Sequence, residues 1–217
     1  MYEKARQEML KTQIARRGVR DKRVLAAMGE VPREAFVEPG FEASAYEDRA
    51  LPIAEGQTIS QPYVVAVMLA AADLHPGDRV LEVGAGSGYA AAVLSRLVAH
   101  VFAIERLPAL AAVAEKRGRA LGYDNITFRT GDGSNGWPEE APFDAILVAA
   151  SGPEPPDALK RQLVMGGRLI MPVEESGDQR LTRLTRLEEA KFSRDEFGGV
   201  KFVPLIGAQG WPDTEQS

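Results

Sequence analysis

The sequence predicts an α/β fold: a doubly wound, mostly parallel sheet with a helical preface before it and antiparallel strands after it. Short apolar runs alternate with helical stretches between residues 79 and 171, as expected when helices cover both faces of a parallel sheet. A glycine-rich turn follows the first of these runs, at the point where such folds bind nucleotides. After residue 179 the alternation stops, and strand-like runs follow one another directly.

Composition limits the class of protein. The 217 residues, 45% hydrophobic and 26% charged, predict one domain over residues 1–217. A formal net charge of −5 gives no general attraction to nucleic acid or an anionic membrane. The absence of cysteine excludes a thiol nucleophile, and two histidines are too few for a histidine-rich metal site. With no apolar signal core after Met1 and no run long enough to cross a bilayer, we expect a cytoplasmic protein, and we expect a monomer.

The first 50 residues are predicted to be helical and are too short to bury a core alone. Residues 3–17 carry apolar side chains among basic ones, which predicts an amphipathic helix. Asp21 can cap a second helix that runs to about Met28, and residues 31–33 then turn the chain.

From residue 51 onward the expected elements follow in order. Residues 51–61 hold polar side chains between glycine and proline and predict a loop, after which Pro62 begins an apolar helix to Leu74. The strands of the parallel sheet are expected at residues 79–83, 101–104, 126–128, 143–148 and 167–171. The helices between them are expected at residues 89–97, 108–121 and 157–164. Residues 180–187 and 197–205 are expected to form the antiparallel strands.

The glycine-rich turn lies in the stretch Val80-Leu81-Glu82-Val83-Gly84-Ala85-Gly86-Ser87-Gly88-Tyr89. Its glycines are spaced G-x-G-x-G, whereas dinucleotide enzymes typically show G-x-G-x-x-G, and Glu82 precedes them. This pattern suits a ligand without a pyrophosphate, and S-adenosylmethionine is the leading candidate. Its carboxylate can use backbone amides and its ammonium an acidic side chain. The alternative is a glycine-rich corner that holds no ligand.

Acidic residues also follow the next two predicted strands. Glu105 ends the second strand, a position from which a carboxylate can accept hydrogen bonds from ribose hydroxyls. Asp132 lies between Gly131 and Gly133 after the third strand, where it could accept a hydrogen bond from an adenine amino group. The alternatives are a solvated glutamate and an ordinary Asp-Gly turn.

Besides the glycine turn, several other stretches form a recognisable series along the chain: Arg17-Gly18-Val19, Val31-Pro32-Arg33, Gly56-Gln57-Thr58-Ile59-Ser60-Gln61-Pro62-Tyr63, Gly131-Asp132-Gly133, Ala141–Ile146, Gly166–Val173 and Phe202-Val203-Pro204-Leu205. Together they resemble the protein-L-isoaspartate O-methyltransferase family, and the resemblance extends to about Gly207. Residues 56–63 are the distinguishing part, because methyltransferases in general share the glycine turn.

The resemblance implies a Rossmann-like methyltransferase fold in one domain. Its parts are a helical preface (1–50), a substrate loop (51–61), a cofactor-binding α/β core (62–178) and C-terminal strands (179–210). Ser60 corresponds to the catalytic residue, which contacts the substrate carboxylate. The residues that correspond to the cofactor site are Gln57, Thr58, Ile59, Tyr63, Glu82, Gly84, Gly86, Gly88, Glu105, Arg106, Asp132 and Gly133. Tyr63 stands where some members carry histidine, and Ile206 where some carry threonine. No metal is implied.

The implied activity is methyl transfer from S-adenosylmethionine to the α-carboxylate of L-isoaspartyl residues in damaged proteins and peptides, which initiates repair through a succinimide. Such a carboxylate, with a pKa of roughly 3.5 by analogy with a free α-carboxyl group, is already ionised, so no general base is needed. Ser60 is then expected to donate a hydrogen bond that fixes the acceptor.

Other readings of the sequence remain open. The chain could methylate a different acceptor, or be a non-catalytic homologue that binds the cofactor. Ser60 and Thr58 could instead cap the helix at Pro62. The glycine spacing and Glu82 disfavour a nicotinamide oxidoreductase, and the lack of a neighbouring histidine disfavours a serine hydrolase.

Overall fold

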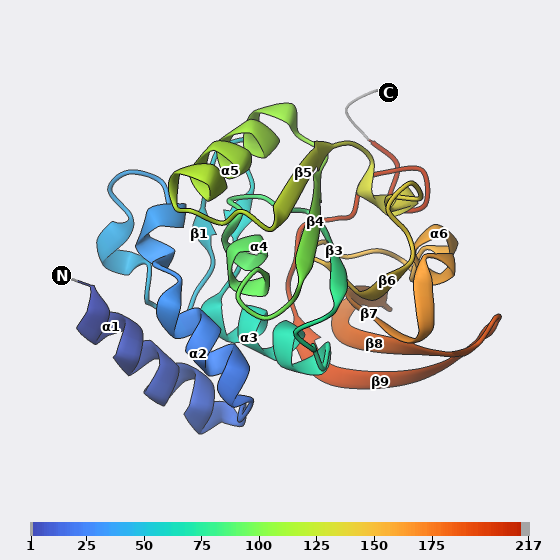
Figure 1. The fold of residues 1–217 in the computed structure, drawn as a ribbon, viewed down its shortest axis with the longest axis horizontal. Coiled ribbons are helices and arrows are strands. Elements are labelled where there is room, and N and C mark those ends of the chain that lie inside the picture. The colour runs from blue at the N-terminus through green and yellow to red at the C-terminus, as the bar shows by residue number, and fades with distance from the viewer. Residues whose placement is uncertain (1, 214–217) are drawn as a thin grey trace.

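The computed structural model describes residues 2–213 as a mixed sheet flanked by helices (Figure 1). The main sheet has seven strands in the order β5-β4-β3-β6-β7-β8-β9. The five strands β3 to β7 run parallel to one another, whereas β8 and β9 are antiparallel to their neighbours. This confirms the predicted fold class. Residues 1 and 214–217 of the predicted domain lie outside the described part of the chain.

Three parallel strands position the site: β3 (Arg79–Val83), β4 (His100–Glu105) and β6 (Phe143–Val148). β4 pairs with one side of β3 and β6 with the other, so the strand order reverses at β3. In open α/β sheets, ligands bind outside the carboxyl ends of the strands at such a reversal. The remaining strands of the sheet are β5 (Ile126–Thr130), β7 (Leu163–Glu175), β8 (Asp178–Glu188) and β9 (Lys191–Val200).

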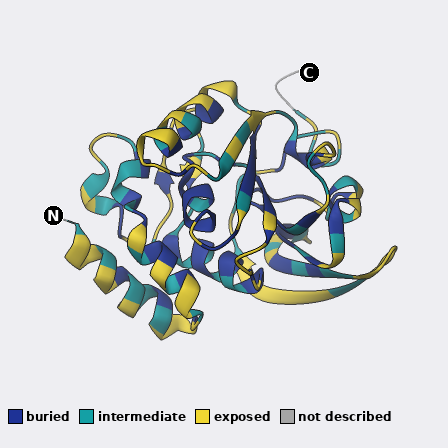
Figure 2. Ribbon diagram, in the orientation of Figure 1, coloured by how far each residue is buried: buried dark blue, intermediate teal, exposed yellow. Residues whose placement is uncertain are grey.

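Both faces of the parallel strands are covered. The core helices are α3 (Pro62–Ala71), α4 (Tyr89–Leu94), α5 (Pro108–Ala120) and α6 (Asp157–Arg161). Because strand side chains alternate between faces, Val80 of β3 joins the hydrophobic cluster that contains α3 and α4. Leu81 and Val83 join a second cluster with Trp137 and Leu159. Burial on both faces explains why these strands are almost continuously apolar, and Figure 2 shows the central strands buried.

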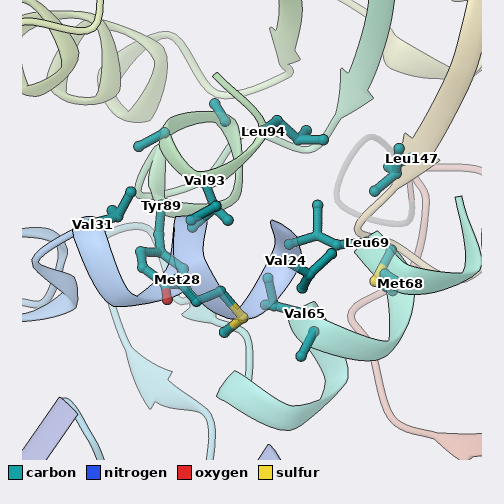
Figure 3. Packing of buried hydrophobic residues seen from close by; sticks show 14 of the residues in the cluster. Val24, Met28, Val31, Val65, Met68, Leu69, Tyr89, Val93, Leu94 and Leu147 are labelled. Carbon is teal, nitrogen blue, oxygen red and sulfur yellow. The ribbon is translucent and has the colours of Figure 1, made fainter. Parts of the chain in front are cut away.

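The N-terminal segment is helical, as predicted, and packs against the core. α1 (Glu3–Glu8) continues through π-helical and 3₁₀ turns before α2 (Lys22–Glu30) begins. The Asp21 carboxylate caps α2 by accepting hydrogen bonds from the amides of Arg23 (2.8 Å) and Val24 (3.2 Å), which confirms the predicted cap. Figure 3 shows apolar side chains of α2 in one cluster with side chains of α3 and α4.

The stretch predicted as a loop at residues 51–61 contains a small β-hairpin. β1 (Leu51–Pro52) pairs antiparallel with β2 (Thr58–Ile59). The amide of Ile53 donates to the carbonyl of Gln57 at 2.9 Å, and the chain turns at residues 55 and 56, whose φ angles are 57° and 64°. The hairpin leads through residues 60–61 directly into α3, so its position depends on where α3 begins.

Several helices end earlier than the sequence predicts. α3 ends at Ala71 and α4 at Leu94, each followed by turns. The helix expected to reach residue 164 ends at Arg161, because Leu163 pairs with Phe143 and begins β7. None of the helices within residues 2–213 is long and apolar enough to cross a membrane.

The last strand is also displaced from its predicted position. The prediction placed it at residues 197–205, but β9 occupies residues 191–200, because a turn at 189–190 brings Lys191 opposite Glu188. Residues 203–205 leave the sheet and lie beside Ser151 after β6. The Ser151 amide donates to the carbonyl of Val203, and the Leu205 amide donates to the carbonyl of Ser151, both at 2.8 Å.

Candidate functional site

A cavity of about 360 Å³ opens at the carboxyl ends of β3 and β4. Its walls come from segments far apart in sequence: the hairpin, the glycine turn after β3, the end of β4, and residues 203–206. Ten of the residues predicted as catalytic or cofactor-binding line the cavity: Gln57, Thr58, Ile59, Ser60, Glu82, Gly84, Gly86, Glu105, Arg106 and Gly133. The fold therefore brings most of the predicted site together in one place.

The glycine turn gives the cavity a wall made of backbone. Gly84 and Gly86 have φ angles of 87° and 53°, which L-residues with side chains rarely adopt. The amide of Gly84 donates to the carbonyl of Ile104 at 2.8 Å, which ties the turn to the end of β4. A Cβ built on Gly86 would lie 3.6 Å from the Cδ1 of Ile53 in the hairpin, so the turn and the hairpin approach each other closely.

Glu82 lines the cavity and has one unpaired carboxylate oxygen. Its side chain is 2% exposed, and Oε2 has no hydrogen-bond partner within the described residues. Burial, and then the negative charge of Glu105, raise the pKa of Glu82 well above its usual value of 4.5. A buried carboxylate without a partner is costly, so this site fits a ligand that brings a positive charge.

Glu105 is held in place by backbone amides. Its Oε2 accepts from the amide of Gly86 at 2.8 Å, and its Oε1 accepts from the amide of Leu107 at 3.0 Å. Each carboxylate oxygen can accept more than one hydrogen bond, so both retain capacity for ligand hydroxyls. Arg106 lines the cavity next to Glu105 and forms an ion pair of 3.1 Å with Asp213.

Ser60 follows the hairpin directly and lines the cavity. The carbonyl of Ser60 accepts a hydrogen bond of 2.8 Å from Arg33 Nη2. The helix cap of α3 is Gln61, with no side-chain cap bond, and Asp48 Oδ1 accepts from the amide of Tyr63 at 3.3 Å. Neither Ser60 nor Thr58 therefore caps α3, contrary to the alternative drawn from the sequence.

The carboxylate of Asp132 is occupied by the protein itself. Oδ1 accepts from the amide (2.9 Å) and hydroxyl (2.7 Å) of Ser134, and Oδ2 accepts from Asn135 Nδ2 (3.0 Å) and the amide of Ala208 (2.8 Å). Asp132 does not line the cavity, whereas its neighbour Gly133 does. An adenine amino group would have to displace one of these bonds to reach the carboxylate.

Tyr63 and Gly88 also lie outside the cavity lining. The guanidinium carbon of Arg17 is 3.4 Å from the centroid of the Tyr63 ring, so Tyr63 packs against the preface. Gly88 is the residue before α4, with φ 85°, and a Cβ there would lie 3.2 Å from the Cβ of Ala114 in α5. Gly88 thus permits the start of α4 to approach α5 closely.

Sequence reasoning missed the wall formed by residues 203–206. The strand expected at residues 197–205 covers most of this stretch, and only Ile206 is marked by the resemblance, as a position where some members carry threonine. Its place in the cavity follows from the backbone bonds to Ser151, which the sequence does not reveal. Tyr89, the first residue of α4, lines the cavity too and was not predicted as a site residue.

Comparison with known proteins identifies the family. A family model described as protein-L-isoaspartate(D-aspartate) O-methyltransferase matches residues 4–210. The chain belongs to this family. The protein-L-isoaspartate O-methyltransferase of Brucella anthropi is 54% identical over 213 residues, which is 98% of each chain. That of Methylorubrum populi is 57% identical over 210 residues, covering 97% of this chain and 99% of the relative.

Solved structures agree with membership of the protein-L-isoaspartate O-methyltransferase family. One described by that name has a TM-score of 0.85 at 31% identity and covers 97% of this chain and 67% of its own. A Plasmodium falciparum structure, described as a putative enzyme of this kind in complex with S-adenosyl-L-homocysteine, has a TM-score of 0.80 at 28% identity, covering 93% and 98%. They confirm the predicted Rossmann-like methyltransferase fold.

Proposed function

We propose that this chain transfers a methyl group from S-adenosylmethionine to the α-carboxylate of L-isoaspartyl residues in damaged proteins and peptides. The observation that carries the proposal is a single cavity lined by the glycine turn, by the buried Glu82 with its unpaired carboxylate oxygen, and by Ser60. The names of the relatives from Brucella anthropi and Methylorubrum populi support the substrate class. The S-adenosyl-L-homocysteine in the Plasmodium falciparum structure supports the cofactor.

The residues of the cavity fit this cofactor. Glu82 would accept hydrogen bonds from its ammonium. The amides of Gly84, Ala85 and Gly86 already donate to the carbonyl of Ile104 and to Glu105, so the cofactor carboxylate would need other donors. Glu105 keeps lone pairs for the ribose hydroxyls after binding the amides of Gly86 and Leu107. When bound, S-adenosylmethionine supplies a methyl group already activated on a sulfonium.

The chain's own task is to hold and orient the acceptor. Ser60 donates a hydrogen bond to the acceptor carboxylate, which is ionised at neutral pH and needs no base. Holding reactants in line supplies about 7–11 kcal/mol of a barrier. The hairpin and residues 203–206 form walls of the same cavity, and they exclude water from the carboxylate.

The remaining site residues fall into two groups in this proposal. Gln57, Thr58, Ile59, Arg106 and Gly133 surround the cofactor from the cavity walls. Asp132, Gly88 and Tyr63 act from behind the walls. Asp132 holds residue 208, which follows the wall at residues 203–206, and Gly88 and Tyr63 lie at the starts of α4 and α3, which both reach the cavity.

We further propose that the predicted parts keep the roles the resemblance implies: preface (1–50), substrate loop (51–61), cofactor-binding core (62–178) and C-terminal strands (179–210). The protein acts as a cytoplasmic monomer on peptide segments, without a nucleic-acid or membrane partner. The net charge of −5 supports the absence of a polyanionic partner. After release, the methyl ester cyclises to a succinimide, whose hydrolysis partly restores normal aspartate.

A matched pair of peptides tests the proposed function. The wild-type chain is incubated with S-adenosylmethionine and either an isoaspartyl peptide or its normal aspartyl twin of identical sequence. We expect methyl ester on the isoaspartyl peptide only. Equal transfer to both would indicate another acceptor class, and cofactor binding by calorimetry with transfer to neither would indicate a binding protein. Either result would contradict the proposal.

Ser60→Ala is expected to lower kcat/KM for the isoaspartyl peptide by about 10- to 100-fold, because one hydrogen bond to a charged group is lost. Affinity for S-adenosyl-L-homocysteine, measured by calorimetry, should stay within about twofold of wild type, since Ser60 contacts the acceptor and the cofactor-binding residues are unchanged. Ser193→Ala, on the outer strand β9, is the matched control and should behave as wild type. A collapse of cofactor affinity in Ser60→Ala alone would place Ser60 in the cofactor site instead.

A further inference from the structure

The most deeply buried charged side chain near Ser60 is Arg33, which begins a 3₁₀ turn (Arg33–Phe36) in the preface. Its side chain is 0% exposed. Arg33 Nε donates to the carbonyl of Ala45 at 2.7 Å, and Nη2 donates to the carbonyl of Ser60 at 2.8 Å. Nη1 has no hydrogen-bond partner, and no carboxylate within residues 2–213 forms an ion pair with the guanidinium.

A second contact joins Arg33 to the cavity wall. Its guanidinium carbon lies 4.8 Å from the centroid of the Tyr89 ring, and Tyr89 lines the cavity. Tyr89 is 1% exposed and belongs to the cluster that α2, α3 and α4 share (Figure 3). Arg33 therefore contacts the loop at Ala45, the end of the hairpin and the first residue of α4 at once.

Such a group needs a compensating role, because a buried cation without a carboxylate partner is unfavourable. Burial lowers the pKa of the Arg33 guanidinium, and nearby Tyr89, Tyr46 and Asp48 offset only part of that effect. Arginine keeps its charge in proteins and presents its donors in a rigid fork. The fork reaches the backbone at the point where the hairpin joins α3, which is where the Ser60 side chain originates.

We propose that Arg33 is a positioning residue for the acceptor: it fixes the backbone of Ser60, and its charge favours an anionic substrate beside the Ser60 hydroxyl. The inference rests on the proposed function, because it needs a carboxylate as acceptor. Arg33 does not line the cavity, so it acts through Ser60 and through the electrostatic field, without touching the substrate. The cofactor site at Glu82 and Glu105 has no hydrogen bond to Arg33 and should be little affected.

Arg33→Met and Arg33→Lys separate the two contributions. Methionine removes both charge and donors, whereas lysine keeps the charge and loses the fork. With the isoaspartyl peptide at saturating S-adenosylmethionine, we expect KM to rise by about tenfold or more in Arg33→Met and less in Arg33→Lys, with kcat reduced in both. Affinity for S-adenosyl-L-homocysteine should stay within about twofold of wild type by calorimetry. Amide hydrogen exchange at residues 57–61 should be faster in both variants.

Arg23→Met is the matched control. Arg23 also belongs to the preface and also donates to backbone carbonyls of the core, those of Leu74 and Leu97, but it does not line the cavity. Its loss should leave KM and exchange at residues 57–61 unchanged. Melting curves show which variants fold. If Arg33→Met does not fold, the KM, kcat and hydrogen exchange of Arg33→Lys test the positioning role.

The outcomes distinguish this inference from the proposed function. Wild-type chain that fails to methylate the isoaspartyl peptide would overturn both. Active wild type with unchanged KM and kcat in the folded Arg33 variants would overturn the positioning role alone. A loss of cofactor affinity as large as the loss for the peptide would also overturn it, because the residue would then support the fold in general.

Discussion

Replacing Glu82 by glutamine is expected to weaken cofactor binding by about 10- to 100-fold and, at the same time, to stabilise the cofactor-free protein. Both effects have one cause. The buried carboxylate has an oxygen without a partner and lies near the negative charge of Glu105. Glutamine is close in shape but carries no charge, so it relieves the cost of burial and loses the attraction for the ammonium.

The direction of the pH dependence follows from the raised pKa of Glu82. Between 4.5, its usual value, and its value in the folded chain, the folded state binds a proton that the unfolded state has released. The stabilising contribution of that proton is therefore present at low pH and is lost as the pH rises through the folded pKa. Cofactor binding needs the ionised form, so affinity should fall as the pH is lowered, and this fall should be absent in Glu82→Gln.

Calorimetry with S-adenosyl-L-homocysteine and thermal melting without ligand measure the two effects. For a chain of this size, each kcal/mol gained corresponds to about 2–4 °C in Tm. Glu189→Gln, in the exposed turn after β8, is the matched control and should change neither quantity. A lower Tm in Glu82→Gln, or unchanged affinity, would show that the carboxylate is satisfied in a way this structure does not contain.

Gly207→Ala is expected to displace the Ile206 end of the wall at residues 203–206 and so to weaken cofactor binding by about 5- to 100-fold. A Cβ at this position would lie 2.1 Å from Asp132 Oδ1 and 2.6 Å from Ser134 Oγ, far inside normal contact. The collision breaks the hydrogen bonds that Asp132 and Ser134 accept from the amides of Ala208 (2.8 Å) and Gln209 (3.0 Å). Those bonds tie the C-terminal segment to the end of β5.

Affinity for S-adenosyl-L-homocysteine, again by calorimetry, checks this prediction. Gly77→Ala is the control, because its Cβ would meet nothing within 4 Å and its backbone needs no glycine. Asp132→Asn should weaken cofactor binding as much as Gly207→Ala does. The NH₂ group of the asparagine would face groups that now donate hydrogen bonds to the carboxylate. Weak binding in Asp132→Asn together with normal binding in Gly207→Ala would mean that the carboxylate contacts the cofactor directly.

The central part of the site could be predicted from sequence because its geometry is local. Gly84 and Gly86 adopt positive φ angles, and a glycine-rich stretch directly after a strand predicts such a turn. Glu105 is the last residue of its strand, so its position at the carboxyl end of the parallel strands follows from the length of that strand. Parallel pairing of β3 with β4 then brings both features to one edge, as the alternation of strands and helices predicts.

The rest could not be predicted, because it depends on contacts between distant residues. Asp132 has the residue type and spacing of a ligand, but amides from residue 208, far along the chain, occupy one of its oxygens. Arg33 looked like part of a turn, and only the tertiary fold places it under Ser60. The shift of β9 has a similar cause, since residues 203–205 carry a strand-like pattern but pair with Ser151.

The wall contributed by residues 203–206 has a consequence for biosynthesis. These residues leave the ribosome after every strand of the sheet, and the backbone bonds to Ser151 cannot form before they emerge. Trp211 adds a bond from its indole nitrogen to the carbonyl of Ser151 at 3.0 Å, which comes later still. A nascent chain stopped at residue 202 would hold the whole sheet and both buried glutamates, yet its ligand site would stand open on one side.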